Sequence, residues 1–280
     1  MSTRAQLISQ ATTLLEKFRT PQPQAEAEFL LAAAEGVSRT RVLAFSTQPV
    51  TSADEQKFWN FIEQKKRGVP VAYITGESDF GGLILHSDSR ALVPRPETEE
   101  LAQYCANLFE RGANPAVLDM CTGSGCLALY LAAKLPRAQV TGADISPDAL
   151  ALAAENARLT KLQEHVRLIQ SDLFENISGT FDLIVSNPPY IPSQEISGLS
   201  AEVQHEPKLA LDGGADGLDT IRKIVSVAVD YLNPHGTLAL EIGDGQAARV
   251  CALFDGTLWD GGIKKDFAGV ERFIFARLKN

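Results

Sequence analysis

The fold is decided by one stretch near the middle of the chain, Val117-Leu118-Asp119-Met120-Cys121-Thr122-Gly123-Ser124-Gly125-Cys126. It begins as a short β-type run, and the small residues that follow allow a tight turn before a helix starts. Such a turn lets backbone N–H groups approach a nucleotide-like ligand closely. The dinucleotide fingerprint G-x-G-x-x-G is matched only in part, because Ala128 replaces its last glycine. A turn that merely packs the helix on the strand is therefore an alternative.

Strand and helix patterns alternate on both sides of this stretch. Their β-type runs are apolar on both faces, which predicts an α/β fold with a mainly parallel sheet covered by helices on both sides. Ligands of such sheets lie beyond the carboxyl ends of the strands. We expect strands at Val117–Met120, Gln139–Ala143, Val166–Ile169, Phe181–Ser186, Thr237–Ile242 and Arg272–Ala276, and helices at about Gly125–Lys134, Pro147–Thr160, Leu218–Leu232 and Gln246–Leu253.

The N-terminal third of the chain is organised differently. Residues 1–70 show helical spacing of apolar residues and predict a small helical domain. Residues 71–95 predict a linking β-hairpin, because the β-type runs Val71–Thr75 and Leu83–His86 are separated by glycines. A helix is expected at Thr98–Arg111 with Thr98 as its N-cap, so that residues 96–280 form the second domain.

Composition limits the class of protein. The 280 residues are 45% hydrophobic and 22% charged, which is typical of a folded globular protein. Residues 1–70 carry a formal charge of +2 and residues 71–280 carry −11, so the larger part lacks the basic stripe expected of a nucleic-acid binder. The four cysteines form no Cys-x-x-Cys pair, and we expect neither disulfides nor a metal site. Without a signal peptide or a membrane-spanning stretch, the chain is expected in the cytoplasm.

Two acidic positions follow strands of the predicted sheet. Asp144 comes nineteen residues after Gly125, at the spacing where an acid accepts both hydroxyls of a ribose. Capping of the next helix by Asp144 or Ser146 is the alternative. Asp172, after the third strand, could accept a hydrogen bond from an adenine amino group, with Leu173 covering the ring.

The most specific motif is Asn187-Pro188-Pro189-Tyr190, directly after the strand Phe181–Ser186. Successive prolines hold the backbone extended and free the Pro188 carbonyl from a sheet ladder. That carbonyl and the Asn187 amide oxygen are two acceptors beside the flat ring of Tyr190. This arrangement suits a planar NH₂ group that must be held while it attacks an electrophile. A structural turn would explain the two prolines but not the whole motif.

The chain resembles S-adenosylmethionine-dependent methyltransferases that act on planar nitrogens, and in particular the peptide chain release factor N5-glutamine methyltransferases. Two departures are Cys121, where a glycine is common, and Leu173, where some members carry Trp. The resemblance covers nearly all of residues 70–280 and rests on Asn187–Tyr190 together with Tyr73–Glu77, Phe80–Gly82, Leu92–Glu99, Glu206-Pro207, Ala210-Leu211, Gly217-Leu218 and Glu241–Gly243.

The resemblance implies a Rossmann-like methyltransferase sheet and transfer of a methyl group to the glutamine of the Gly-Gly-Gln motif of bacterial release factors. Because residues 1–70 carry +2 and contain none of the site motifs, we expect them to recognise the factor. The connection Ile191–Asp216 is long for a compact domain unless it is a lid or binding surface, so we expect it to border the peptide channel, with a poorly ordered insertion as the alternative. The protein is expected to act as a monomer. Glutamine methylation of a ribosomal protein, adenine-N6 methylation and a scaffold without activity are the alternatives. The implied S-adenosylmethionine site comprises Cys121, Thr122, Gly123, Ser124, Gly125, Asp144, Asp172, Leu173 and Asn187, and the implied catalytic residues are Asn187, Pro188, Pro189 and Tyr190.

Overall fold

The computed structural model describes residues 1–18 and 20–279, which form two compact units. Unit 1 comprises Met1–Gly76 and the short segment Ser200–His205. Unit 2 comprises Glu77–Leu199 and the chain from Glu206 onward. The long connection Ile191–Asp216 therefore contributes to both units.

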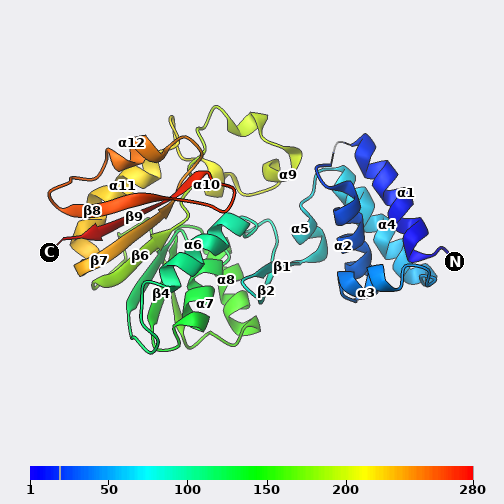
Figure 1. The fold of residues 1–280 in the computed structure, drawn as a ribbon, viewed down its shortest axis with the longest axis horizontal. Helices are drawn as coiled ribbons and strands as arrows, with labels where there is room; N and C mark the ends of the chain where they lie inside the picture. The colour runs from blue at the N-terminus through cyan, green and yellow to red at the C-terminus, as the bar shows by residue number, and fades with distance from the viewer. Residues whose placement is uncertain (19, 280) are drawn as a thin grey trace. The chain divides into compact units, whose positions relative to one another are not determined.

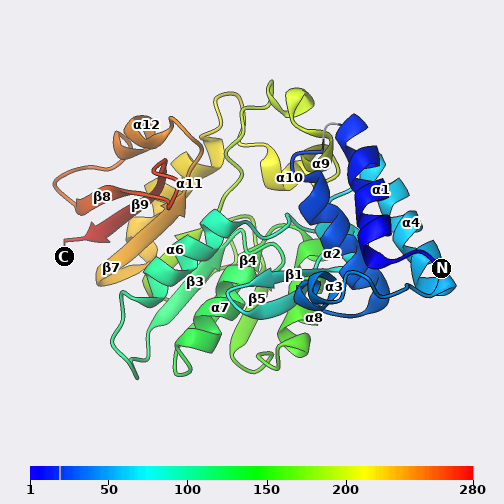
Figure 2. The ribbon, with the colours of Figure 1, turned by 45° about the vertical axis from the view of Figure 1, so that its right-hand side comes forward.

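Unit 1 is helical, as its sequence predicts (Figure 2). Thr3 begins the first helix with a capping box, in which its side chain accepts from the Gln6 N–H and the Gln6 side chain accepts from the Thr3 N–H. Leu7, Leu30 and Phe58 belong to the fully buried core. The helices of the unit are α1 (Arg4–Lys17), α2 (Pro23–Glu35), α3 (Arg39–Ala44), α4 (Ser52–Lys66), α5 (Val71–Thr75) and α9 (Ala201–Gln204).

The prediction of a β-type run at Val71–Thr75 is wrong, because these residues form α5. Pro70 precedes the helix and Gly76 ends it in the left-handed conformation, with φ of 79°. Ile74 is buried in the core of unit 1. Burial of one helical face thus overrides the β propensity of Val, Tyr, Ile and Thr.

The segment Ser200–His205 is attached to unit 1 by polar contacts. Lys65, whose side chain is 1% exposed, forms ion pairs with Glu26 of α2 and Glu202 of α9. The His205 ring contacts the Arg67 carbonyl oxygen at 3.0 Å from Nε2. Buried charges are stable only when paired, so the ammonium of Lys65 connects three parts of unit 1.

The main feature of unit 2 is a seven-stranded sheet with the order β5-β4-β3-β6-β7-β9-β8 (Figure 1). The first five strands in this order are parallel, and β9 is antiparallel to both its neighbours. A separate hairpin pairs β1 with β2. The predicted hairpin therefore exists, but its first strand is Glu77–Phe80 and not Val71–Thr75. The strands are β1 (Glu77–Phe80), β2 (Leu83–His86), β3 (Ala116–Met120), β4 (Gln139–Asp144), β5 (Val166–Gln170), β6 (Phe181–Ser186), β7 (Leu232–Glu241), β8 (Trp259–Lys265) and β9 (Glu271–Leu278).

Helices cover both faces of this sheet, which confirms the predicted Rossmann-like α/β architecture (Figure 1). Alternate residues of β3 enter different cores: Val117 packs with α6 and α7, and Leu118 packs with α11 and α12. The helices of unit 2 are α6 (Pro96–Ala106), α7 (Cys126–Lys134), α8 (Pro147–Leu159), α10 (Lys208–Leu211), α11 (Asp219–Ala228) and α12 (Ala247–Cys251), with 3₁₀ turns at Ile196–Gly198 and Val229–Tyr231.

Two other predictions for unit 2 need correction. The helix expected at Thr98–Arg111 is α6, which starts at Pro96 with Arg95 as N-cap, because the fixed φ of proline suits the first helical position. Thr98 is consequently inside the helix and caps nothing. The edge strand β8 was not predicted, because Asp260-Gly261-Gly262 and the exposed lysines after Ile263 resemble a polar loop.

We predict that Lys65→Met lowers the free energy of unfolding by about 3 kcal/mol, because it leaves the half-buried carboxylates of unit 1 without their cation. Burial already raises the pKa of Glu26 against the lowering effect of Lys65. Urea unfolding followed by circular dichroism measures the loss. The matched control is Lys66→Met, whose partner Glu63 is exposed, and it should cost about 1 kcal/mol or less. Equal losses in both variants would contradict the assignment.

Candidate active site

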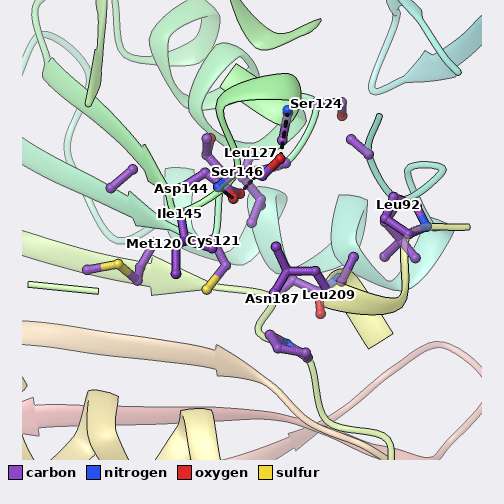
Figure 3. Close-up of a pocket in the computed structure, with 18 of the residues that line it drawn as sticks. Leu92, Met120, Cys121, Ser124, Leu127, Asp144, Ile145, Ser146, Asn187 and Leu209 are labelled. Carbon is purple, nitrogen blue, oxygen red and sulfur yellow. Dashed lines mark hydrogen bonds between the residues drawn. The ribbon is translucent and has the colours of Figure 1, made fainter. Parts of the chain in front are cut away.

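A pocket in unit 2 opens at the carboxyl ends of β3, β4, β5 and β6. Figure 3 shows Met120, Cys121 and Asp144 along one wall, with Asn187 and Leu209 across from them. This is the position at which open α/β sheets bind ligands, and the strand order reverses here between β3 and β6.

Most of the predicted site residues line this one pocket. Gly125, Pro188 and Tyr190 lie beside it rather than among its lining residues. The predicted residues that line it are Cys121, Thr122, Gly123, Ser124, Asp144, Asp172, Leu173, Asn187 and Pro189. The structure thus brings together residues from four strand ends, and their roles stay predictions.

The turn after β3 is built around a buried carboxylate. Asp119 Oδ2 accepts a hydrogen bond from Thr122 Oγ1 at 2.5 Å and one from the Ala128 N–H at 3.1 Å. Within the described residues, Asp119 Oδ1 is buried without a hydrogen-bond partner. Burial raises the pKa of Asp119 to about 7, against the lowering effect of the two hydrogen bonds. Asp119 therefore ties the turn to the start of α7 at a cost in desolvation.

The backbone of the turn is left-handed at Cys121, with φ of 62°, a conformation that favours glycine. Leu173, also a pocket residue, has a φ of 48°. At Gly125, with φ of 82°, an added Cβ would lie 3.1 Å from the Ala153 Cβ. Strain of this kind is typical of functional sites, where the surrounding structure holds the backbone in place.

Asp144 ends β4 and points toward the turn. Its Oδ2 accepts from the Gly123 N–H at 2.8 Å and its Oδ1 from the Ser146 N–H at 2.9 Å. Burial raises its pKa, while these backbone hydrogen bonds lower it. Ser146, and not Asp144, is the cap of α8, because its hydroxyl accepts from the Ala149 N–H. The capping alternative is thus accounted for by Ser146, and Asp144 lies in the pocket.

Asn187 follows β6 and is held by residues far away in the sequence. Its Nδ2 donates to Thr98 Oγ1 at 3.0 Å, and Thr98 Oγ1 donates to Glu241 Oε2 at 2.7 Å. Tyr190 Oη lies 3.4 Å from Glu241 Oε1. Because Nδ2 is used by Thr98, Oδ1 is the atom of the Asn187 amide that remains to accept from a ligand.

Sequence reasoning missed the roles of Thr98 and Glu241. The sequence predicts a helix cap at Thr98, and Glu241 belongs only to the motif Glu241–Gly243 that carries the family resemblance. Glu241 is 1% exposed, and burial raises its pKa to about 7. A carboxylate directly after the apolar run Leu238–Leu240, at the carboxyl end of β7, is a signal that could have identified it.

The connection after Tyr190 completes the pocket. It has secondary structure of its own and is not an unordered insertion. Glu206 accepts hydrogen bonds from the Val93 N–H at 3.0 Å and from Arg95 Nη2. Pro207, Leu209 and Ala210 line the pocket next to it. The pair Glu206–Arg95 therefore joins the connection to the segment before α6.

Two absences hold for the described residues. No three His, Cys, Asp or Glu side chains come together as metal ligands in the ranges 1–18 and 20–279. None of the helices in those ranges is long and apolar enough to cross a membrane. The four cysteines are free thiols.

Comparison with known proteins identifies close relatives. Two family models match the chain, the PrmC N-terminal domain at residues 6–76 and the methyltransferase small domain at residues 101–206. A release factor glutamine methyltransferase from Deinococcus radiodurans is 42% identical, over 97% of each chain. The protein of that name from Moorella thermoacetica is 39% identical, over 98% of each chain.

Solved structures share the fold at low sequence identity. A methyltransferase from Pyrococcus furiosus matches 82% of this chain and 100% of its own with a TM-score of 0.53, at 21% identity. A T. thermophilus 16S rRNA N2 G1207 methyltransferase, solved with AdoMet and guanosine, matches 73% of this chain and 50% of its own with a TM-score of 0.51, at 19% identity.

We predict that Asp119 makes the protein less stable as the pH rises. The folded-state pKa of about 7 lies above the ordinary value of 3.8, so between these values the folded protein holds a proton that the unfolded chain releases. The free energy of unfolding should fall by up to about 1.4 kcal/mol per pH unit in that window. Urea unfolding at a series of pH values measures the slope.

Asp119→Asn should flatten this slope. The pKa of Glu241 is also raised, and Glu241 contributes equally to the pH dependence of both proteins. The difference between the two slopes is therefore due to Asp119. Identical slopes in the two proteins would show that Asp119 is ionised in the folded state throughout the window.

Proposed function

The chain belongs to the release factor glutamine methyltransferase family, and from this premise we propose that it methylates the side-chain amide nitrogen of the Gly-Gly-Gln glutamine in a release factor, with S-adenosylmethionine as methyl donor. The observation that carries the proposal is near full-length identity of 37 to 42% to relatives of that name. The pocket supports it independently, since Asn187 lines it together with the turn Cys121–Ser124 and the acid Asp144, and the Pro188 carbonyl lies beside it.

The residues of the pocket fit S-adenosylmethionine. Each carboxylate oxygen of Asp144 accepts one backbone hydrogen bond, from Gly123 or from Ser146. Each oxygen therefore has a lone pair left to accept from a ribose hydroxyl. Cys121 and Leu173 are partly buried and supply apolar surface, and the exposed Asp172 stands beside them for an adenine amino group. When bound, S-adenosylmethionine would supply a methyl group activated by its positive sulfur.

An amide nitrogen is a weak nucleophile because its lone pair is delocalised, so the protein must orient it. In the proposal, Asn187 Oδ1 and the Pro188 carbonyl oxygen each accept a hydrogen bond from one N–H group of the substrate amide. Their negative ends then face the nitrogen on which positive charge develops during transfer. Positioning of this kind supplies up to about 7 to 11 kcal/mol in favourable cases. The methylated nitrogen would then lose one of its N–H protons to water, so the proposal assigns no general base.

Tyr190 has a supporting role in this proposal. Burial and the neighbouring Glu241 raise the pKa of its hydroxyl, which therefore stays protonated. Its backbone carbonyl accepts from Gln246 Nε2 at 2.9 Å, which holds the end of the motif. Tyr190 does not line the pocket. Its ring would therefore contact the substrate amide only at the edge of the pocket.

Asp144→Ala and Asn187→Ala should separate binding from turnover. Asp144→Ala loses a charged acceptor and should weaken cofactor binding by about 1.5 to 3 kcal/mol per lost bond, measured by calorimetry. Asn187→Ala should bind the cofactor nearly as the parent does and yet transfer almost no methyl. The transfer assay uses labelled S-adenosylmethionine with purified release factor, ribosomal protein and DNA in parallel. Label on the ribosomal protein or DNA alone would overturn the proposed substrate, and normal turnover by Asn187→Ala would overturn the mechanism.

We also propose that unit 1 recognises the release factor. Phe29 and Phe45 are each 47% exposed on this unit. Arg39 lies 4.8 Å over the ring of Phe29, and Arg41 lies 5.7 Å over that of Phe45. Aromatic and arginine side chains are enriched at protein interfaces.

Accordingly, the double variant Phe29→Ser, Phe45→Ser should lower kcat/KM on the intact release factor roughly tenfold, the effect of losing one interface anchor. On a short peptide that contains Gly-Gly-Gln, kcat/KM should be unchanged. Leu258→Ser, an exposed apolar position of unit 2, is the matched control. Equal losses on factor and peptide would place recognition elsewhere.

A further inference from the structure

We infer that Glu241, acting through the Thr98 hydroxyl, determines which atom of the Asn187 amide faces the substrate, so that Thr98 and Glu241 are positioning residues for methyl transfer. The inference rests on the proposed function of the pocket. It concerns residues from α6 and the end of β7, neither of which the Asn187–Tyr190 motif includes.

The direction of the hydrogen bonds carries the argument. An ionised carboxylate can only accept, so the single proton of the Thr98 hydroxyl goes to Glu241. Thr98 Oγ1 can then only accept from Asn187, which turns Nδ2 toward Thr98 and makes Oδ1 the free end of the amide. If these two hydrogen bonds ran in the opposite direction, Asn187 would present an N–H group to the substrate amide, where an acceptor is needed.

Burial holds this series of hydrogen bonds in place. The bond between Thr98 and Glu241 is fully buried, and the two residues are 143 positions apart in the sequence. In a site of low dielectric such bonds polarise one another, so the negative charge on Glu241 also strengthens Asn187 Oδ1 as an acceptor. This offers a physical reason for keeping a carboxylate buried at the end of β7, where desolvation is costly.

Protonation of Glu241 would weaken the arrangement. The neutral acid has a donor of its own, which permits the reversed direction. The ionisable groups that face Glu241 are Glu97 of α6, Cys126 of α7, Tyr190 after β6 and Arg272 of β9. The pKa of Cys126 is raised to about 12 and that of Tyr190 is raised as well, both mainly by burial, so neither titrates near neutrality.

The first test compares Thr98→Val with Thr98→Ser in the full chain. Thr98→Val keeps the shape but loses the hydroxyl, and its kcat for release factor methylation should fall roughly tenfold or more, with the cofactor dissociation constant unchanged. Thr98→Ser should recover most of the lost activity. Ser87→Ala controls for the loss of a buried hydroxyl, since the Ser87 side chain contacts the Ser78 hydroxyl in the hairpin at 2.8 Å, away from the pocket. A Thr98→Val enzyme with parental kcat, or a Thr98→Ser enzyme as slow as Thr98→Val, would overturn the inference.

The second test is the pH profile of kcat. In the parent, kcat should rise between about pH 6 and pH 8 as Glu241 loses its proton, and Glu241→Gln should be slow with a flat profile. Glu97→Gln should keep the inflection. A Glu241→Gln enzyme with parental kcat, or with the same inflection, would contradict the role of Glu241.

A third measurement does not depend on any substrate. The side-chain NH₂ of Asn187, assigned by its absence in Asn187→Asp, should exchange slowly with solvent by NMR in the parent and in Thr98→Ser, and fast in Thr98→Val. Fast exchange in the parent would overturn the inference. If the parent shows slow exchange but no methyl transfer to a release factor, the proposed function fails while the orientation of Asn187 stands.

Discussion

Strand β3 lies between β4 and β6, and the register of these two pairings determines where the pocket residues stand. Met120 is paired with Ala143 on one side and with Ser186 on the other. The next residues along the three strands are Cys121, Asp144 and Asn187, so the turn, the acid and the amide are brought to one edge of the sheet by backbone pairing alone. The Ser186 hydroxyl donates to the Met120 carbonyl oxygen at 2.5 Å and adds a side-chain bond at this level. A shift of one residue in either pairing would turn Asp144 or Asn187 to the other face.

Two buried carboxylates stand behind this edge and orient the residues in front of them. Asp119 holds the turn after β3 through Thr122, and Glu241 holds Asn187 through Thr98. In both cases a threonine hydroxyl donates to the acid, and the Thr98 hydroxyl also accepts from Asn187. Burial raises the pKa of both acids to about 7. The protein therefore gives up stability at neutral pH in exchange for fixed directions of hydrogen bonding at the pocket.

Local patterns were sufficient to predict most of the fold and to locate most of the predicted site residues at one pocket. The strand–turn–helix stretch and the alternation after it predict the parallel sheet, and strand ends locate Asp144 and Asn187. The errors occur where distant packing decides. Val71–Thr75 is helical because Ile74 enters the core of unit 1, and β8 is recognisable only through its pairing with β9. Thr98 has an ordinary cap sequence, and only the structure places it in the pocket lining and in contact with Glu241, 143 positions away. The periodicity of a sequence cannot reveal contacts between residues that are so far apart along the chain.

The long connection from β6 to α11 is held in place at several points along its length. Asn187–Tyr190 begin it at the pocket, Ser200–His205 belong to unit 1, and Glu206 returns to unit 2, where it binds Arg95. Each of these parts has its own anchor: Thr98 for Asn187, Lys65 for Glu202, and the Val93 N–H for Glu206. Ordering a long segment costs about 1 to 2 kcal/mol per residue in backbone entropy, which scattered surface contacts do not offset. The hydrogen bond to Thr98, the ion pair with the buried Lys65 and the hydrogen bond from the Val93 N–H offset part of this cost at three points. The same backbone therefore carries residues of the proposed recognition unit and of the proposed catalytic pocket within twenty positions of each other.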